Sequence, residues 1–353
     1  MLSRCRSSAP YFKRKNALNR PPVDSTFVPV AQLRSFAADC LKAVGLLRNH
    51  ADQLAKLLSD SDLRGVRSHG TRAIPGYCQR LQDGGNNPKP DLQILQDTPT
   101  TALVDGDGGL GYAPMMQATE IAIAKAKEHK VALGATCHHG HYGSAGHFVR
   151  RAMDEGCTAF SVQGAHPDYF GEGGGNKTQQ SAYWGNPPIS FGFPAEEEPP
   201  LILDAATCIM ADYHRGPEYD ALQELIPPAF FKSMGYTGSA LALGGAFVGQ
   251  NSDQARAIAQ QWPRAKNGGL IIVMDIGAFV PPKAFREGID NLVRGVRETM
   301  EPVRGHDEAT LPGTIEDRKA KEYTTTGVPI AVEDLERLTD CGRRLGVEAE
   351  WNL

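Results

Sequence analysis

The sequence has no apolar segment that approaches the roughly 20 residues needed to cross a bilayer, which argues against a membrane partner. It has no CxxC pair either, and its seven scattered cysteines are typical of a chain kept in a reducing compartment. It lacks a basic excess, because 37 Lys and Arg stand against 41 Asp and Glu, which argues against a nucleic-acid partner. The 353 residues, 41% of them hydrophobic, predict a globular protein with a large core.

Acidic residues are absent from the beginning of the chain until Asp24, whereas basic residues and serines are frequent there. This composition suits a mitochondrial transit peptide. The alternative is a disordered basic tail. We therefore treat residues 1–23 as an extension outside the fold, and expect a cytoplasmic protein, with mitochondrial import as the alternative.

Apolar periodicity predicts two helices within residues 29–62, separated by Gly45, with Asn49 as the N-cap of the second. Further helices are predicted at 115–129, 146–155 and 333–345, and strands at 101–105, 131–136, 158–162, 201–203 and 270–274. Residues 156–204 are rich in glycine and proline, which indicates strands joined by long loops. Because strands and helices do not alternate steadily, an α/β fold is expected without regular βα units.

The most informative segment runs from Cys137 to Gly146, CHHGHYGSAG, between a predicted strand and a predicted helix. A histidine in such a glycine-rich turn can be exposed at a cleft, and a nearby helix N-terminus keeps an imidazole neutral. A neutral histidine exchanges a proton near pH 7. The alternative is that these histidines are ordinary polar loop residues.

A metal site is not expected in this segment. The cluster of His138, His139, His141 and His147, with Cys137 beside it, has ligand-type side chains. However, adjacent ligands on one short loop rarely converge on one ion, and zinc sites usually need a further ligand and a closed geometry.

The segment GDGGLG, residues 106–111, matches the GxGxxG pattern between a predicted strand and a predicted helix. A dinucleotide-binding site of this kind also needs an acidic residue at the end of the next strand. That strand ends at Thr136, where Cys137 and His138 follow. A glycine-rich turn is therefore favoured over a Rossmann site.

Three further features have both a functional and a plain interpretation. Ser68 and His69, with Arg72 nearby, offer groups that bind a carboxylate, or they belong to a loop that joins two helices. The glycines near 171–175 permit close approach to a ligand, or form a flexible loop. Lys232 alone is uninformative, since most lysines are solvated.

Taken in order, several segments resemble the malate/L-lactate dehydrogenase family that is distinct from the Rossmann lactate dehydrogenases. They are DLRGVRSHG (62–70), DGDGGLG (105–111), HYGSAG (141–146), GGG (173–175), WGNPPISFGFP (184–194), LDAAT (203–207), KSMGYTG (232–238) and LPGT (311–314). The resemblance covers roughly residues 27–350, and the order of the motifs carries it more than any single one.

This resemblance implies a non-Rossmann α/β fold, a homodimer, and NAD or NADP as cofactor. It implies a helical domain from 24–95 and 280–353 and a cofactor-binding sheet domain over 96–279. It implies that His141 is the proton donor and acceptor and that Ser68 and His69 lie near the substrate. The expected cofactor contacts are Gly173, Gly174, Asp204, Ala205, Ala206 and Lys232.

The sequence departs from the family pattern at several places. Ala73 stands where the family has an arginine for the substrate carboxylate, and Arg72 lies one residue earlier. Pro187 interrupts the family's GTNP segment, and Ala165 replaces a serine that contacts the cofactor. The chain between Asp204 and Lys232 is about 20 residues shorter than usual.

Together these observations predict an NAD(P)-dependent oxidoreductase that interconverts a small 2-hydroxy acid and its 2-oxo acid. The small-molecule carboxylate substrate is expected to contact Arg72 in place of the missing arginine. The alternative hypothesis is a weak or inactive homologue that binds a nucleotide or serves as an oligomeric scaffold. The departures from the pattern motivate this alternative.

Overall fold

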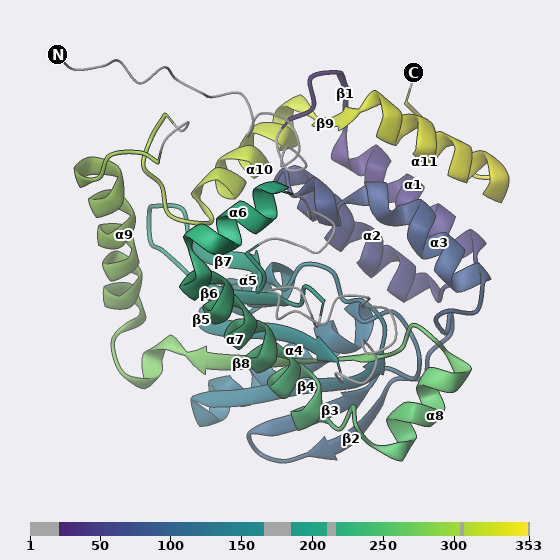
Figure 1. The fold of residues 1–353 in the computed structure, drawn as a ribbon, viewed down its shortest axis with the longest axis horizontal. Coiled ribbons are helices and arrows are strands. Elements are labelled where there is room, and N and C mark those ends of the chain that lie inside the picture. Colours follow the sequence, from purple (N-terminus) through teal and green to yellow (C-terminus); the bar gives the residue numbers. More distant parts are fainter. Residues whose placement is uncertain (1–20, 166–184, 210–216, 304–306, 352–353) are drawn as a thin grey trace.

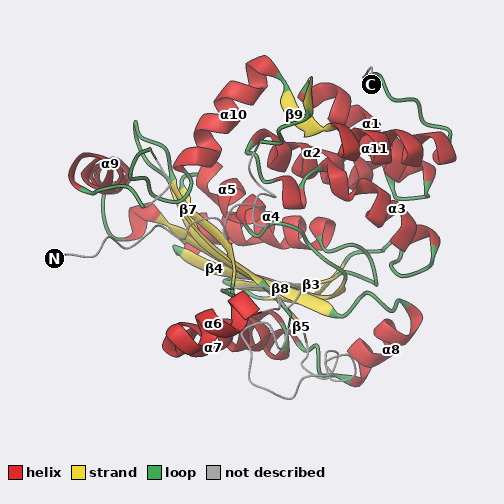
Figure 2. Cartoon of the chain, turned by 45° about the horizontal axis from the view of Figure 1, so that its top comes forward, coloured by secondary structure: helices red, strands yellow, loops and turns green. Residues whose placement is uncertain are grey.

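A seven-stranded sheet separates two sets of helices (Figure 1, Figure 2). The computed structural model describes residues 21–165, 185–209, 217–303 and 307–351. The first 20 residues and the segment with Gly173 and Gly174 lie outside the described residues, so the expectations made for them stay expectations. In the part of the chain that is described, no helix is both long and apolar enough to cross a membrane.

The order of the strands shows that the sheet is mixed. The strands are β2 (Gln93–Asp97), β3 (Thr101–Asp105), β4 (Val131–His139), β5 (Cys157–Ala165), β6 (Pro188–Phe193), β7 (Leu201–Ala206) and β8 (Asn267–Asp275). Their spatial order is β2-β3-β4-β8-β5-β6-β7. β3 and β4 run parallel, and the other neighbouring pairs among these strands are antiparallel. The expected α/β class without regular βα units is thus confirmed, and a doubly wound parallel sheet is excluded.

Each face of the sheet is covered by helices with apolar and small residues. On one face lie α4 (Tyr112–His129) and α5 (Gly146–Asp154), and Phe148 and Val149 pack there against Ile271. On the other face lies α7 (Pro227–Gly244), with α6 (Pro217–Leu225) beside it (Figure 2). α7 approaches so closely that a Cβ on Gly164 would lie 2.4 Å from the carbonyl oxygen of Ala240. Only glycine permits this contact.

A second hydrophobic core is formed by helices from both ends of the chain. Its helices are α1 (Val30–Ala43), α2 (Arg48–Leu63), α3 (Ile74–Gln82), α10 (Thr314–Thr326) and α11 (Val332–Leu345). Buried side chains such as Leu33 and Leu58 pack there against Leu335 and Leu338. β1 (Ser25–Val28) pairs antiparallel with β9 (Val328–Ala331), which joins the two ends directly. This helical group lies above α4 and α5 in Figure 2.

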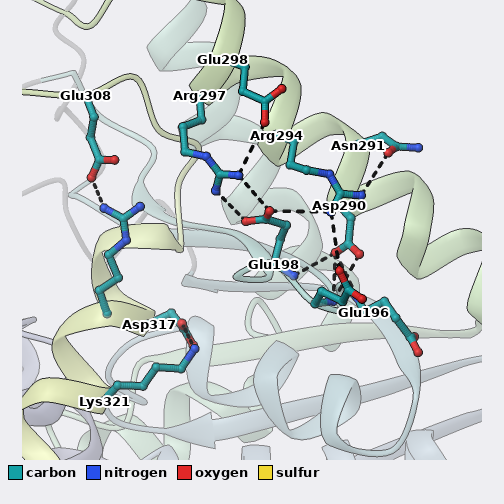
Figure 3. Close-up of polar contacts among 12 residues, drawn as sticks. Glu196, Glu198, Asp290, Asn291, Arg294, Arg297, Glu298, Glu308, Asp317 and Lys321 are labelled. Carbon is teal, nitrogen blue, oxygen red and sulfur yellow. Dashed lines mark hydrogen bonds and ion pairs between the residues drawn. The ribbon is translucent and has the colours of Figure 1, made fainter.

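α9 (Pro282–Thr299) lies apart from the helical group and is held to the turn between β6 and β7 by charged contacts (Figure 3). The carboxylate of Asp290 accepts hydrogen bonds from the backbone N–H groups of residues 196–198. Arg297 forms a bidentate ion pair with Glu198, at 2.7 and 2.9 Å. Because the same turn binds both groups, α9 is fixed there despite its exposed outer face.

The predicted elements match the structure in type, and the differences lie at their ends. Both helices within 29–62 form, but the second begins at Arg48 after Leu47, and no side chain caps it. The prediction that Asn49 is its N-cap is therefore wrong by two positions, because Asn49 already lies in the first turn. β4 continues three residues beyond the predicted end at Thr136, which extends the strand into the histidine segment.

Candidate active site

His141 lies in a loop that two elements of regular structure hold in place. β4 ends at His139 and α5 begins at Gly146, so the loop between them follows the end of an interior strand of the sheet. Gly143 has φ +82°, and a Cβ there would lie 2.3 Å from the hydroxyl of Tyr112. Both the backbone conformation and the lack of space therefore disfavour any residue other than glycine at position 143. The loop thus depends on glycine for its close contact with α4.

The imidazole of His141 is oriented by two tyrosines. Its Nδ1 lies 2.8 Å from the hydroxyl of Tyr77 on α3, and that hydroxyl lies 2.8 Å from the hydroxyl of Tyr112 on α4. With Nδ1 bonded to Tyr77, Nε2 remains for a substrate. Since each hydroxyl can donate or accept, the tyrosine pair accommodates either neutral tautomer of His141. Tyr77 and Tyr112 were not among the residues predicted from the sequence.

The surroundings of His141 favour its neutral form. Burial, together with nearby His69 and Arg80, lowers the pKa of His141 to about 3. Burial, rather than the helix N-terminus expected from the sequence, is the main cause of this lowered pKa. A neutral imidazole is the form that accepts a proton from a hydroxyl group.

Ser68 and His69 lie beside His141, and their expected contact with the substrate stays a prediction. The rings of His69 and His141 stack with their centroids 5.8 Å apart. Ser68 Oγ lies 2.9 Å from His69 Nδ1. Burial lowers the pKa of His69, while Asp204 acts in the opposite direction. Two regions more than 70 residues apart in the sequence therefore supply adjacent imidazoles.

A buried carboxyl supports the turn that carries Ser68 and His69. Asp62, at the end of α2, accepts hydrogen bonds from the backbone N–H and the hydroxyl of Thr71, at 2.8 and 2.6 Å. A Cβ on Gly70 would lie 1.7 Å from Asp62 Oδ1, so the turn needs glycine at that position. Burial raises the pKa of Asp62 to about 7, against the lowering effect of its hydrogen bonds to Thr71.

A cavity of about 320 Å³ opens beside His141. Its walls include Arg80, Asn86, Ala165, Arg264 and Lys266. Three of these residues are cationic, so the cavity favours an anionic ligand. Its position brings together the end of α3, the histidine loop, the end of β5 and the segment before β8.

Arg72 is not among the residues that line the cavity beside His141, and the expectation that it contacts the substrate stays a prediction. Its Nε is 3.6 Å from Asp334 on α11, and Arg67 binds the same carboxylate at 2.9 Å. Arg72 lines a different cavity, of about 620 Å³, with Arg337, Arg343 and other residues of α11. The one-residue shift from position 73 turns this side chain toward α11, because neighbouring residues of a helical turn point in different directions.

Arg80 lines the cavity beside His141, together with Arg264. It lies seven residues after Ala73, two turns further along α3, and so on a similar face of the helix. Its guanidinium carbon lies 5.4 Å from the centre of the Tyr77 ring, a cation–π contact that orients it. Arg80 was not among the residues predicted from the sequence, although the helical spacing of 73 and 80 is a signal that could have identified it.

The segments matched to the cofactor are brought together by hydrogen bonds. Thr207, which follows β7, binds α7 through its carbonyl oxygen, which accepts from Ser233 Oγ at 2.8 Å. This contact sets Lys232, whose side chain is exposed, near the end of β7 with Ala205 and Ala206. β7 is also an edge strand of the described sheet. Small residues on an edge strand leave room for a ligand to approach the backbone.

Asp204 has a second contact, which links β7 to the histidine loop. Its carboxylate accepts a hydrogen bond from Ser144 Oγ, three residues after His141. A Cβ on Gly146 would lie 2.6 Å from Asp204 Oδ2, so the start of α5 is also close. Asp204 therefore connects the loop that carries His141 to β7, which belongs to the segment matched to the cofactor.

The glycines of GDGGLG make room for protein atoms. A Cβ on Gly106 would lie 2.6 Å from the Cβ of His139, and one on Gly111 would lie 2.5 Å from His139 Nδ1. A Cβ on Gly109 would meet Pro90 at 2.8 Å. The glycines let the turn pack on the histidine segment, in agreement with the preference for a glycine-rich turn over a phosphate-binding one.

The four clustered histidines do not share one centre. His138 binds Asp105, His139 binds Thr136, His141 binds Tyr77 and His147 binds Ser61. One pair of adjacent side chains in this segment nevertheless lies together, although adjacent ligands on a short loop were not expected to converge. Cys137 and His138 lie together with Asp105, and their potential ligand atoms are all within 4.8 Å of one another.

Comparison with known proteins gives consistent matches over most of the chain. A family model described as malate/L-lactate dehydrogenase matches residues 28–227. The L-sulfolactate dehydrogenase of Methanocaldococcus jannaschii is 31% identical over 343 residues, covering 88% of this chain and 95% of the relative. The NAD(+) ureidoglycolate dehydrogenase of Escherichia coli O157:H7 is 26% identical, covering 82% of this chain and 88% of the relative.

Solved structures match the fold as a whole. The malate dehydrogenase of Pyrococcus horikoshii superposes with a TM-score of 0.78 at 24% identity, covering 93% of this chain and 98% of that one. The sulfolactate dehydrogenase of Methanocaldococcus jannaschii superposes with a TM-score of 0.70 at 26% identity, covering 92% and 99%. The expected non-Rossmann fold, similar to these dehydrogenases, is thereby confirmed.

Proposed function

Because the chain belongs to the malate/L-lactate dehydrogenase family, we propose that it interconverts a small anionic 2-hydroxy acid and its 2-oxo acid, with Arg80 as the main carboxylate contact. Family membership makes the chain an oxidoreductase that acts on CH–OH groups with a nicotinamide cofactor. The observation that carries the proposal is a neutral imidazole, His141, held by Tyr77 in a cationic cavity.

The residues near the end of β7 fit a nicotinamide nucleotide. Small side chains at Ala205 and Ala206 leave the edge strand accessible, and exposed Lys232 supplies a cation for a phosphate group. These residues would hold the cofactor, together with Gly173 and Gly174, and Asp204 would join them to the histidine loop. When bound, the cofactor supplies the hydride acceptor or donor.

The proton follows a path set by His141. In the oxidation direction Nε2 takes the proton of the substrate hydroxyl, while Tyr77 stabilises the resulting imidazolium through Nδ1. In the reduction direction the same proton returns to the developing oxyanion. A bound carboxylate near Arg80 compensates the positive charges around His141, which raises the pKa of the imidazole toward the working pH.

Ser68 and His69 orient the substrate. The ring of His69 stacks on that of His141, and Ser68 Oγ engages its Nδ1. His69 thereby presents Nε2 to a substrate oxygen, so it binds and positions, while His141 moves the proton.

His141→Ala tests the proposal directly. We expect kcat to fall roughly 10²- to 10⁴-fold while nucleotide binding, measured by fluorescence of NADH and NADPH, stays within error. His129→Ala is the control, since His129 lies at the exposed end of α4. The assay uses both cofactors and a panel of 2-oxo acids. An inactive homologue would bind nucleotide without turnover of any acid, and full activity of His141→Ala would refute the assignment.

Arg80→Ala and Arg72→Ala separate the two candidate carboxylate contacts. Loss of a charged hydrogen bond costs about 1.5–3 kcal/mol, so we expect Arg80→Ala to raise KM roughly tenfold or more. Arg72→Ala should leave KM unchanged, because Arg72 binds Asp334. If KM rises for Arg72→Ala alone, the original expectation from the sequence is right and the assignment of Arg80 is wrong.

We also infer a homodimer, which the family resemblance implies. Exposed aromatic side chains on α7, Phe231 and Tyr236, support a contact with a second copy. Light scattering of the purified protein measures the mass in solution. A monomer at micromolar concentration would contradict this inference without affecting the assignment of His141.

A further inference from the structure

Three side chains with different ligand atoms meet at the ends of β3 and β4. His138 Nδ1 lies 3.0 Å from Asp105 Oδ1 and 3.5 Å from Cys137 Sγ. The three ligand atoms lie within 4.8 Å of one another, and the residues are 9%, 1% and 3% exposed for Asp105, Cys137 and His138. None of these residues takes part in the proton path described for His141.

The backbone explains why neighbours on one strand point to the same place. Successive side chains of a regular strand point to opposite faces. Here the register of β4 with β8 shifts between Thr136 and His139, and His138 has φ +53°, which turns its ring back toward Cys137. The kink is held by backbone bonds from Gly106 N–H to the carbonyl of Cys137, at 2.9 Å, and from Gly108 N–H to that of His138, at 2.8 Å.

Asp105 completes the group through the one parallel pairing described in the sheet. β3 and β4 run side by side, and Asp105 is the register partner of Cys137. Tetrahedral bonding to zinc at usual bond lengths separates sulfur from nitrogen by about 3.5 Å and nitrogen from oxygen by about 3.3 Å. The two separations from His138 Nδ1, 3.5 Å to Cys137 Sγ and 3.0 Å to Asp105 Oδ1, therefore need only a few tenths of an ångström of adjustment, and the third is within 4.8 Å.

We propose that Asp105, Cys137 and His138 bind one transition-metal ion of the zinc class. The mixed sulfur, nitrogen and oxygen set suits zinc and disfavours magnesium and calcium, which prefer oxygen alone. Binding replaces the thiol proton of Cys137 by the metal and releases that proton to solvent. A divalent ion with one thiolate, one carboxylate and a neutral imidazole has no net charge, which avoids the cost of burying an unpaired charge.

Such an ion would tie two strand ends together just before the catalytic loop. His138 precedes His141 by three residues, and Gly106, which contacts His139, follows Asp105 directly. The ion would act through the position of this loop and would not touch the substrate. The alternative is that no metal binds, and that Asp105 and His138 form a hydrogen bond beside the thiol of Cys137.

The test measures metal directly, without reference to activity. The full chain is purified, and a second sample is refolded in the presence of Co²⁺ or Zn²⁺ so that burial cannot block entry. We expect one equivalent of metal by elemental mass spectrometry and, with Co²⁺, intense tetrahedral absorption with a sulfur-to-metal band. Cys137→Ala should weaken binding by at least about tenfold and abolish the sulfur band.

Cys157→Ala is the matched control, because Cys157 is also buried in a strand and its sulfur lies 4.0 Å from the carbonyl oxygen of Glu155. It should bind metal as the unmodified chain does. Asp105→Asn serves as a second variant if Cys137→Ala fails to fold, and it too should lose the bound ion. The proposal is overturned if the refolded full chain binds less than half an equivalent, or if Cys137→Ala retains the sulfur-to-cobalt band.

Discussion

Replacing Tyr77 by phenylalanine removes one oxygen atom from the site. That oxygen lies 2.8 Å from both His141 Nδ1 and the hydroxyl of Tyr112. During oxidation the imidazole becomes charged, and a hydrogen bond to a charged group contributes about 1.5–3 kcal/mol. At 1.36 kcal/mol per tenfold, kcat should fall roughly 10- to 150-fold in Tyr77→Phe.

The same change lowers stability for a separate reason. Tyr112 is buried, and its hydroxyl would lose its partner, at a cost of about 1–3 kcal/mol in the free energy of unfolding. Tyr112→Phe leaves Tyr77 without the same partner but keeps the bond to His141. We therefore expect Tyr77→Phe to lose more stability in urea than Tyr112→Phe, and only Tyr77→Phe to lose most of its kcat.

The assay is steady-state kinetics over pH with the best 2-oxo acid and its hydroxy acid. KM should change little in Tyr77→Phe, because the walls described for the cavity beside His141 do not include Tyr77. Equal losses of kcat in the two variants would show that the effect reflects stability rather than support of His141. An unchanged kcat in Tyr77→Phe would refute the role given to its hydroxyl.

Three further predictions concern pH and the chain ends. Since the pKa of His141 is lowered from 6.5 to about 3, kcat/KM for oxidation should stay level from pH 8 to about 5, and an acid limb near 6.5 would contradict this. Asp62 has a pKa raised from 3.8 to about 7, so its contribution to stability is fully present below pH 3.8 and is lost as the pH rises through 7. Urea unfolding of Asp62→Asn between pH 5 and 8 should show a smaller decline than the unmodified chain, and parallel curves would argue against it. A chain shortened to begin at Asp24 should keep its melting temperature, because β1 starts at Ser25, and residues 1–23 fused to a fluorescent reporter should show by microscopy whether they direct import into mitochondria.

The sequence alone determined the local structure well. Apolar periodicity located α1, α4 and α11, and runs of β-branched and apolar residues located β3, β4 and β8. The histidine segment was also recognised in the sequence, because glycines at a strand-to-helix turn indicate a loop that must approach its neighbours closely. Periodicity and turn residues are local properties, so they can be read without knowing the fold.

Element ends were less accurate, because they depend on contacts outside the element. β4 continues to His139 since β8, more than 120 residues away, pairs with it through a shifted register. Asn49 suits an N-cap by residue type, yet α2 begins at Arg48. There the backbone N–H of Leu47 donates to the carbonyl of Pro88, which fixes the entry of the chain.

The composition of the site was decided by tertiary structure. Arg72, in the short turn before α3, binds Asp334, whereas Arg80, near the end of α3, reaches the cavity beside His141. Tyr77 meets His141 only because α3 packs beside the histidine loop. The sequence thus determined which residues carry suitable chemistry. Packing alone decided which of them share a site, because the direction of a side chain depends on helix rotation and strand register, and both are fixed by distant contacts.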